Sequence, residues 1–245
     1  MKVLELFSGT GSVGKICKEY GWEVVSLDLK GADINTNILD WDYTQYPEGH
    51  FDIIWASPPC DTFSALRRTW IGRKLKAHNG LVCTSELLQK DIDTIGLPIL
   101  RQTEKIIDYL KPTFYFMENP QTGLMKNYVD RPYYDVDYCK YTDWGYKKRT
   151  RIWTNLKGFE NKLCKNDCDN IMEGCNKHKA NFGGPKIIKD GDKVVKVNTK
   201  ALRDKYKEFE NIQPYLKGGG NNRNERYRIP PLLIHELFDL TTHED

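Results

Sequence analysis

Two residues of this chain could carry covalent chemistry on a substrate: the thiol of Cys60 and the carboxyl group of Glu118. Cys60 closes a Ser-Pro-Pro-Cys sequence, and Glu118 opens a Glu-Asn-Pro sequence. A thiol held beside a carboxyl group suits acid-assisted nucleophilic chemistry, in which the sulfur attacks and the acid supplies a proton. Both residues also have a structural interpretation, because a free cysteine often fills core space and a carboxylate often only hydrogen-bonds nearby groups.

Each of these residues follows a short apolar segment that is typical of a buried strand. Residues 51–56 and 113–117 are rich in aromatic and β-branched side chains. The prolines that follow cannot continue strand pairing, so each strand should end where the reactive residue stands. In a parallel sheet Cys60 and Glu118 would then lie on the same carboxyl edge, where open α/β folds bind their ligands.

A glycine-rich turn near the amino terminus predicts a nucleotide-cofactor site at the same edge. An expected strand over residues 2–7 leads into Ser-Gly-Thr-Gly-Ser-Val-Gly over residues 8–14, and then into a helix. The Gly-x-Gly-x-x-Gly spacing permits a tight turn, and the helix would offer free N–H groups to a ligand.

Acidic residues beyond this turn extend the predicted cofactor site. Asp28 ends an expected strand over residues 23–27, at the distance from the glycine turn where such folds bind ribose hydroxyl groups. Asp40, next to Trp41, suits an adenine amino group and ring. The competing interpretations are a surface aspartate at position 28 and a core tryptophan at position 41.

Basic residues gather in two further places. Arg149 and Arg151 alternate along an expected strand, so both side chains should lie on one face, where they would hold a carbonyl oxygen or phosphate or simply be solvated. Residues 61–94 have no strong hydrophobic period and predict a mobile loop with some helix. Four basic residues of that loop are expected to meet phosphates, namely Arg67, Arg68, Arg73 and Lys74.

Composition restricts the class of protein. The chain has 245 residues, 39% of them hydrophobic and 29% charged, which suits one large soluble domain or a core domain with a small appendage. No stretch is long and apolar enough to span a membrane, and we expect no signal peptide. Seven scattered cysteines argue against a disulfide framework and predict a reducing cytoplasm.

Residues 155–217 differ in character from the rest, being polar and rich in lysine and asparagine. They contain Cys164, Cys168, Cys175 and His178, a set of soft ligands that could hold a structural zinc ion and stabilise a segment too polar to form its own core. The spacing matches no common zinc-finger pattern, so reduced cysteines without a metal remain the alternative.

Taken in order, these segments resemble the DNA (cytosine-5) methyltransferase family, in particular its small phage- or virus-type members. The resemblance covers residues 3–154 and resumes near residue 218. The segments that carry it are the turn from Leu6 to Gly11, Pro59-Cys60 with Phe63-Ser64, Glu118-Asn119, Arg149-Thr150-Arg151, and a closing motif from Arg226 to Phe238.

The resemblance implies an α/β fold with a doubly wound, Rossmann-like methyltransferase sheet and a small polar target-recognition insertion. A catalytic domain would span residues 1–154 and 218–245, and a target-recognition region residues 155–217. The residues implied around the cofactor S-adenosylmethionine are Phe7, Ser8, Gly9, Thr10, Gly11, Asp28, Leu29, Asp40, Trp41 and Pro59. Those implied against double-stranded DNA are Ser64, Arg67, Arg68, Arg73 and Lys74.

The implied reaction is methyl transfer to C5 of a cytosine flipped out of the duplex. Cys60 would add to C6 of the ring and make C5 nucleophilic. Glu118, with Asn119 beside it, would hold N3, and Arg151 with Arg149 would hold the O2 carbonyl. The resemblance also allows a cognate restriction nuclease as a partner, and a bacterial cytosol or an infected host cell as the location.

The chain departs from the family pattern at three motif positions. Asp61 replaces the usual glutamine after the cysteine, Pro120 replaces valine, and Lys147 stands where a glutamine is expected. None of these changes removes a group that the chemistry requires. Together they indicate a divergent branch of the family.

The sequence leaves three other functions open. An adenine-N6 or cytosine-N4 methyltransferase would share the Pro-Pro element but would need no thiol. An RNA cytosine-5 methyltransferase would keep the chemistry and change the substrate. A catalytically silent nucleic-acid-binding homologue would keep only the fold, and the presence of Cys60, Glu118 and the glycine turn argues against it.

Overall fold

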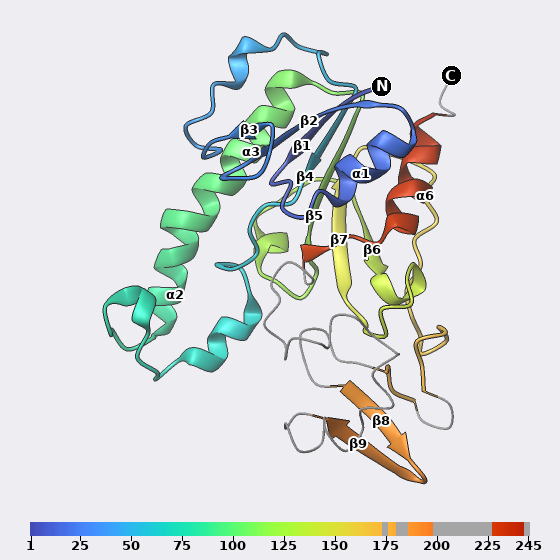
Figure 1. The fold of residues 1–245 in the computed structure, drawn as a ribbon. Helices are drawn as coiled ribbons and strands as arrows, with labels where there is room; N and C mark the ends of the chain where they lie inside the picture. The colour runs from blue at the N-terminus through green and yellow to red at the C-terminus, as the bar shows by residue number, and fades with distance from the viewer. Residues whose placement is uncertain (173–175, 180–185, 198–226, 243–245) are drawn as a thin grey trace. The chain divides into compact units, whose positions relative to one another are not determined.

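The computed structural model describes residues 1–172, 176–179, 186–197 and 227–242 (Figure 1). Its main sheet has seven strands in the order β3-β2-β1-β4-β5-β7-β6, and a separate hairpin pairs β8 with β9. The strands are β1 (Lys2–Leu6), β2 (Glu23–Asp28), β3 (Ile34–Asn35), β4 (Ile53–Ala56), β5 (Phe114–Pro120), β6 (Tyr133–Asp137), β7 (Arg149–Thr154), β8 (Lys186–Asp190) and β9 (Lys193–Val197). The α-helices are α1 (Ser12–Glu19), α2 (Ser85–Asp91), α3 (Leu97–Leu110) and α6 (Pro231–Thr241).

The strand order confirms the predicted doubly wound α/β sheet. Strands β3, β2, β1, β4 and β5 pair in parallel, and β7 pairs with β5 in the antiparallel direction. The chain builds outward from β1 to β3 and then returns to place β4 on the other side of β1. The carboxyl ends of β1 and β4 therefore flank the topological switch point, which is the ligand-binding crevice of such sheets.

Alternating side chains in the strands bury both faces of the sheet. Leu4 and Leu6 of β1 and Ile54 of β4 belong to a core cluster that includes Leu100 and Ile106 of α3. Glu5 has the opposite parity in β1 and accepts hydrogen bonds from the first turn of α1. Helices α1 and α3 thus cover opposite faces.

Strand β5 is longer than the apolar segment that predicted it. Glu118, Asn119 and Pro120 continue the strand because they pair with Ile152, Arg151 and Thr150 of β7. The predicted loop over residues 61–94 is also more ordered than its lack of periodicity indicates. It contains two 3-10 segments, Ala65–Trp70 and Lys76–His78, followed by α2 and by a π-helical turn, Ile92–Gly96, that leads into α3.

The chain divides into two compact units, and each is described by itself. The first comprises residues 1–134 and 150–158, and the second residues 135–149 and 159–245. The second unit contains the 3-10 segment Tyr138–Lys140, the β8–β9 hairpin and α6. Within the described ranges, no helix has the length and apolar character needed to cross a membrane.

Candidate active site

Cys60 lies in the loop that leaves the carboxyl end of β4. All four residues of β4 are buried, and Pro58 behind them is buried as well. Two prolines direct the chain out of the sheet, so Pro59 is exposed and Cys60 is half-buried. The backbone N–H of Ser57 donates to the carbonyl of Leu6 and ties the start of this loop to β1. Cys60 is therefore partly exposed to solvent, in a loop whose start is anchored to β1.

Glu118 comes from the neighbouring parallel strand, one residue beyond the last register pair, Ala56 with Met117. Its side chain is 7% exposed. The parallel pairing brings Glu118 and the loop of Cys60 to the same edge of the sheet, as the sequence predicted. A buried carboxyl group and a half-buried thiol at the same edge of a sheet form an arrangement that can support acid-assisted attack on a substrate.

Two hydrogen bonds join the Cys60 loop to the end of β5 and to the segment that follows it. The side-chain amide of Asn119 donates to the carbonyl of Pro58 at 2.8 Å, and the backbone N–H of Leu124 donates to the carbonyl of Phe63 at 2.8 Å. Asn119 is 2% exposed, so its bond is shielded from water. In this structure Asn119 positions the Cys60 loop, a role that the sequence did not predict.

The predicted cofactor turn is hydrogen-bonded to Asp28. The Gly9 N–H donates to one carboxylate oxygen of Asp28 at 2.9 Å, and the Leu29 N–H donates to the other at 2.6 Å. Gly9 and Gly11 both have positive φ angles, 49° and 65°, which favour glycine. Asp28 thus stands beside the glycine turn at the switch point, with its carboxylate able to accept further hydrogen bonds from a ligand.

The amino terminus of α1 differs from the sequence prediction. The N–H groups of Val13 and Gly14 donate to the buried carboxylate of Glu5, at 3.3 and 3.0 Å, and so are not available to a ligand. Burial raises the pKa of Glu5 to about 7, although these two hydrogen bonds act in the opposite direction. An acidic residue inside an otherwise apolar strand was the sequence signal for this contact.

The other predicted cofactor residues fall in different surroundings. Leu29, Asp40 and Pro59 are exposed, and Phe7 is half-buried in a backbone conformation with φ of 61°. Trp41 is 6% exposed and belongs to the core cluster, where it packs near Tyr43 and Tyr46. The structural alternative for Trp41 therefore fits the observed burial.

The two arginines of β7 have different partners. Arg149 donates to both carboxylate oxygens of Asp137, from Nε at 3.0 Å and from Nη2 at 2.7 Å. The guanidinium group of Arg151 lies over the ring of Tyr133, 3.5 Å from its centroid. Arg149 is thus paired with a carboxylate, whereas the guanidinium group of Arg151 is held over an aromatic ring by a cation–π contact.

Asp137 is a residue that sequence reasoning missed, and no local pattern marks it. It is completely buried and also accepts from the Cys164 N–H at 2.8 Å, with Lys147 Nζ at 3.3 Å. Burial alone would raise the pKa of Asp137, but the bonds from Arg149 and Cys164 and the charge of Lys147 outweigh it and hold the pKa below its usual range. Lys147, one of the three departures noted in the sequence, thus has a partner inside the protein.

The loop over residues 61–94 requires one correction to the predicted DNA contacts. Arg67 is buried and donates to Asp91, which also contacts His78 Nε2 at 3.0 Å. Its guanidinium group is therefore paired within the loop, whereas the prediction placed it against a phosphate. The other basic residues of this loop, Arg68, Arg73 and Lys74, are exposed, and Ser64 is half-buried.

The predicted metal ligands lie partly within the described residues. Cys164, Cys168 and His178 gather in the second unit, and Cys139, which the spacing did not include, joins them. Cys175 lies outside the described residues. Cys139 stands 25 residues before Cys164, so no spacing rule would have linked it to the others.

The fold and the site define a class of protein: a Rossmann-like α/β protein with a glycine turn after β1 and a half-buried cysteine in the loop after β4. A curated protein, "Probable DNA (cytosine-5)-methyltransferase" of Frog virus 3 (isolate Goorha), is 40% identical over 249 residues, covering 98% of this chain and 100% of that protein. The chain therefore belongs to the DNA (cytosine-5) methyltransferase family, a family of S-adenosylmethionine-dependent enzymes. No protein-family model matches it.

Similar solved structures include two distant methyltransferases. The Entamoeba histolytica methyltransferase EhMeth is 17% identical with a TM-score of 0.44, covering 67% of this chain and 55% of that chain. A DNMT2 variant from Spodoptera frugiperda is 19% identical with a TM-score of 0.42, covering 66% and 53%. The present chain spans about half the length of these two proteins.

Proposed function

We propose that this chain methylates C5 of cytosine in double-stranded DNA through a covalent bond between Cys60 and C6 of the base. The observation that carries the proposal is the shared sheet edge: Cys60 follows β4, Glu118 stands in the adjacent parallel strand β5, and the Asn119–Pro58 hydrogen bond holds the two segments together. Family membership supplies the reaction class.

Cys60 is the nucleophile because C5 of cytosine is a weak nucleophile until C6 is attacked. The Cys60 thiolate adds to C6 and breaks the C5–C6 double bond, whose electrons move into an enamine with a C4–C5 double bond. The nucleophilic C5 then takes the methyl group from the sulfonium sulfur of S-adenosylmethionine, with S-adenosylhomocysteine as the leaving group. The C5 proton then passes to a solvent base, the C6–sulfur bond breaks, and the aromatic ring is restored. The half-buried position of Cys60 admits a base that has left the duplex.

Glu118 and Arg151 stabilise the charge that this addition creates. A protonated Glu118 carboxyl group donates to N3, where negative charge develops when sulfur adds to C6. Arg151 donates to the O2 carbonyl from the neighbouring strand β7. Arg149 acts through Asp137, which anchors the start of β7 and so helps to position Arg151.

The switch-point crevice is the proposed site of S-adenosylmethionine, which supplies the electrophilic methyl group. Asp28 accepts from the ribose hydroxyl groups while the Gly9 N–H holds its carboxylate in place. Phe7, half-buried after β1, stacks on the adenine ring, and Asp40 accepts from the adenine amino group. The donor set fits the cofactor because a fixed carboxylate beside an open glycine turn matches a ribose diol.

The exposed residues Arg68, Arg73 and Lys74 meet the DNA backbone in this proposal. Residues 155–217 form the target-recognition region, and residues 1–154 with 218–245 form the catalytic domain. The short recognition region favours a short target sequence.

The test is methyl transfer from labelled S-adenosylmethionine to mixed-sequence duplex DNA, followed by base analysis. Wild type should place the label on 5-methylcytosine, and Cys60→Ala should abolish it. Cys83→Ala is the matched control, since Cys83 is a free, fully buried cysteine of the same unit. Glu118→Gln, compared with the exposed Glu48→Gln, should slow transfer by about 100-fold or more.

Covalent capture tests the intermediate directly. DNA containing 5-fluorocytosine should form a stable adduct with wild type, because fluorine cannot leave C5 as the proton does. Cys83→Ala should form the same adduct and Cys60→Ala none. Label on N4-methylcytosine or N6-methyladenine that persists in Cys60→Ala would refute the proposal. Label on RNA alone, lost in Cys60→Ala, would keep the mechanism and change the substrate.

A further inference from the structure

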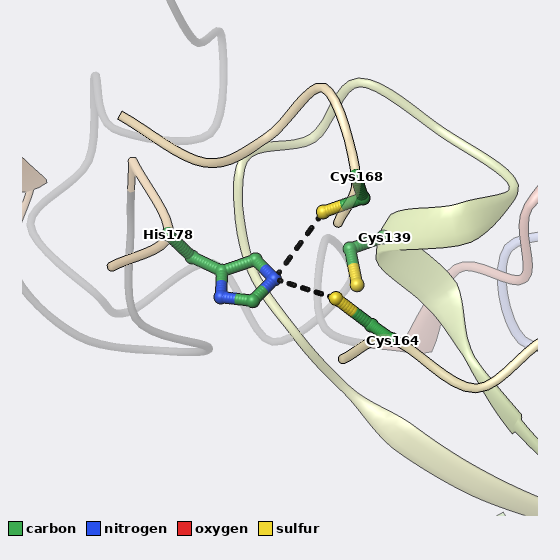
Figure 2. A group of neighbouring side chains, drawn as sticks. All are labelled: Cys139, Cys164, Cys168 and His178. Carbon is green, nitrogen blue, oxygen red and sulfur yellow. Dashed lines mark hydrogen bonds between the residues drawn. The ribbon is translucent and has the colours of Figure 1, made fainter. Parts of the chain in front are cut away.

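Four side chains with soft ligand atoms converge in the second unit, and none of them has a role in the proposed methyl transfer. They are Cys139 in the Tyr138–Lys140 segment, Cys164 and Cys168 in the segment after β7, and His178 (Figure 2). Their sulfur and nitrogen atoms all lie within 4.8 Å of one another. Three separate stretches of chain therefore present one compact set of ligands.

The distances within the group match those of ligands around a single tetrahedral ion. His178 Nε2 lies 3.6 Å from Cys164 Sγ and 3.4 Å from Cys168 Sγ. Zinc–sulfur bonds of about 2.3 Å and zinc–nitrogen bonds of about 2.0 Å at tetrahedral angles separate sulfur from nitrogen by about 3.5 Å. A single imidazole nitrogen forms one good hydrogen bond, so two sulfurs at this distance indicate a shared central atom.

Backbone and side-chain contacts around the four ligands favour the thiolate form of the cysteines. The N–H of Asn166 donates to Cys164 Sγ at 3.3 Å, in a turn where Asn166 has a φ of 65°. Lys140, next to Cys139, pairs with Asp167, next to Cys168, at 3.0 Å. An N–H bond to sulfur stabilises the thiolate, which is the form that binds a metal.

Asn170 holds the ligand-bearing segments together. It is 2% exposed, and its amide nitrogen donates to the carbonyl of Cys139 at 2.9 Å and to that of Thr142 at 2.7 Å. Its side-chain oxygen accepts from the Gly145 N–H, and its carbonyl accepts from the Lys179 N–H. One buried side chain thus fixes the distance between Cys139 and the segment that carries the other ligands.

We infer that Cys139, Cys164, Cys168 and His178 bind one structural zinc ion. Three thiolates and an imidazole are a set that zinc favours, and four protein ligands leave no open position for substrate or water. Residues 160–179, which carry three of the four ligands, are mostly polar, so the metal supplies folding free energy that this segment's own apolar side chains do not.

The ion also supports β7 through a short chain of contacts. The backbone N–H of Cys164 donates to Asp137, and Asp137 binds Arg149, the first residue of β7. A metal that fixes the backbone at Cys164 therefore fixes a donor to the buried Asp137 carboxylate. We expect loss of the metal to make the Arg149 side chain less ordered and to leave the structure of the Cys60 loop unchanged.

The test is the metal content of the full-length protein, purified with a thiol reductant and without chelator. We expect about one zinc ion per chain. Cys139→Ser should lose the metal, while Cys83→Ser, a buried cysteine of the first unit, should retain it. Cys175→Ser should also retain it, which separates this ligand set from the one that sequence spacing predicts.

X-ray absorption at the zinc edge of the wild type covers the case in which Cys139→Ser does not fold. Three sulfur ligands and one nitrogen ligand are expected, and exchange for cobalt should give the intense visible bands of a tetrahedral thiolate site. Protein that folds without any metal and takes up no cobalt would overturn the inference. So would a disulfide between two of the three cysteines, or a metal lost in Cys175→Ser but kept in Cys139→Ser.

Discussion

The side-chain amide of Asn119 donates a 2.8 Å hydrogen bond to the backbone carbonyl of Pro58, two residues before Cys60, the proposed nucleophile. The bond joins the ends of two adjacent parallel strands, β4 and β5, at the point where the catalytic groups are proposed to meet. This hydrogen bond is buried, so a variant that cannot form it leaves the Pro58 carbonyl without its donor in a place shielded from water. The orientation of the Cys60 loop therefore depends on a residue of another strand.

Asn119→Asp should slow methyl transfer more than it lowers stability. The carboxylate would face the Pro58 carbonyl with an acceptor in place of a donor, and a lost buried hydrogen bond of about 1–3 kcal/mol corresponds to about a 10- to 100-fold lower rate. The measurement is the single-turnover rate beside a thermal melt. Asn155→Asp is the matched control, because Asn155 donates in the same way to Thr113 at the other end of β5. An equal loss of rate in both variants would contradict the positioning role.

Gly96→Ala should destabilise the protein although its backbone is helical and alanine favours helices. A Cβ atom at Gly96 would lie 2.4 Å from Thr62 Oγ1 and 2.9 Å from Phe63 Cζ, in the segment that follows Cys60. Overpacking of this kind costs about 1–3 kcal/mol. Urea unfolding measures the cost, and adding Thr62→Ala should recover part of it. A Gly96→Ala variant as stable as wild type would show that the Cys60 segment is not packed against this turn.

Glu5 should make stability fall as pH rises from about 4.5 to about 7. Burial raises its pKa from the ordinary 4.5 to about 7 in the folded state, so folded protein binds more protons than unfolded protein in that range. The contribution is complete below the unfolded pKa and is lost as pH passes the folded one, an effect of up to about 3 kcal/mol. Urea midpoints against pH should show this slope in wild type and in the exposed Glu19→Gln, and not in Glu5→Gln. The same slope in Glu5→Gln would exclude Glu5 as its source.

Asp137→Asn should lower the stability of the second unit more than the substitution of any charged surface residue. It removes the shared partner of Arg149 and Lys147, each about a third exposed, so we expect about 2–4 kcal/mol, below the loss for a fully buried pair. Since the pKa of Asp137 is lowered, its stabilisation is present at neutral pH and lost as acid protonates it. Asp108→Asn, which breaks the exposed pair with Arg131, should cost little. Similar melting temperatures for the two variants would contradict this ranking.

Arg67 and Arg68 should respond differently although they are neighbours. Arg68→Ala should reduce the slope of log DNA affinity against log salt concentration by about 1, because one phosphate contact is lost. Arg67→Ala should leave the slope unchanged and lower the melting temperature, because the buried Asp91 loses its charge partner. A reduced salt slope in Arg67→Ala at unchanged stability would restore Arg67 to the DNA-contacting set.

The sequence by itself determined the strands, the turns and the order of the chemical groups along the chain. Strand periodicity, glycine turns and prolines act over a few neighbouring residues, so the segments around Phe51–Cys60, Gly9–Gly14 and Glu118 were predictable. The doubly wound sheet followed because parallel strands joined by helices have few allowed arrangements. This is why the sequence alone was enough to expect Cys60 and Glu118 at one edge of the sheet.

Only the tertiary structure decided which polar groups satisfy one another. Asn119 reaches Pro58 across 61 residues of chain, and Arg67 reaches Asp91 across 24. A buried polar group needs a hydrogen-bond partner. Which residue becomes that partner depends on how the elements pack together, and no local sequence pattern reveals it. For the same reason Cys139 joins Cys164, Cys168 and His178: a metal ligand set is assembled in space, and spacing along the chain reveals only the members that happen to be near neighbours.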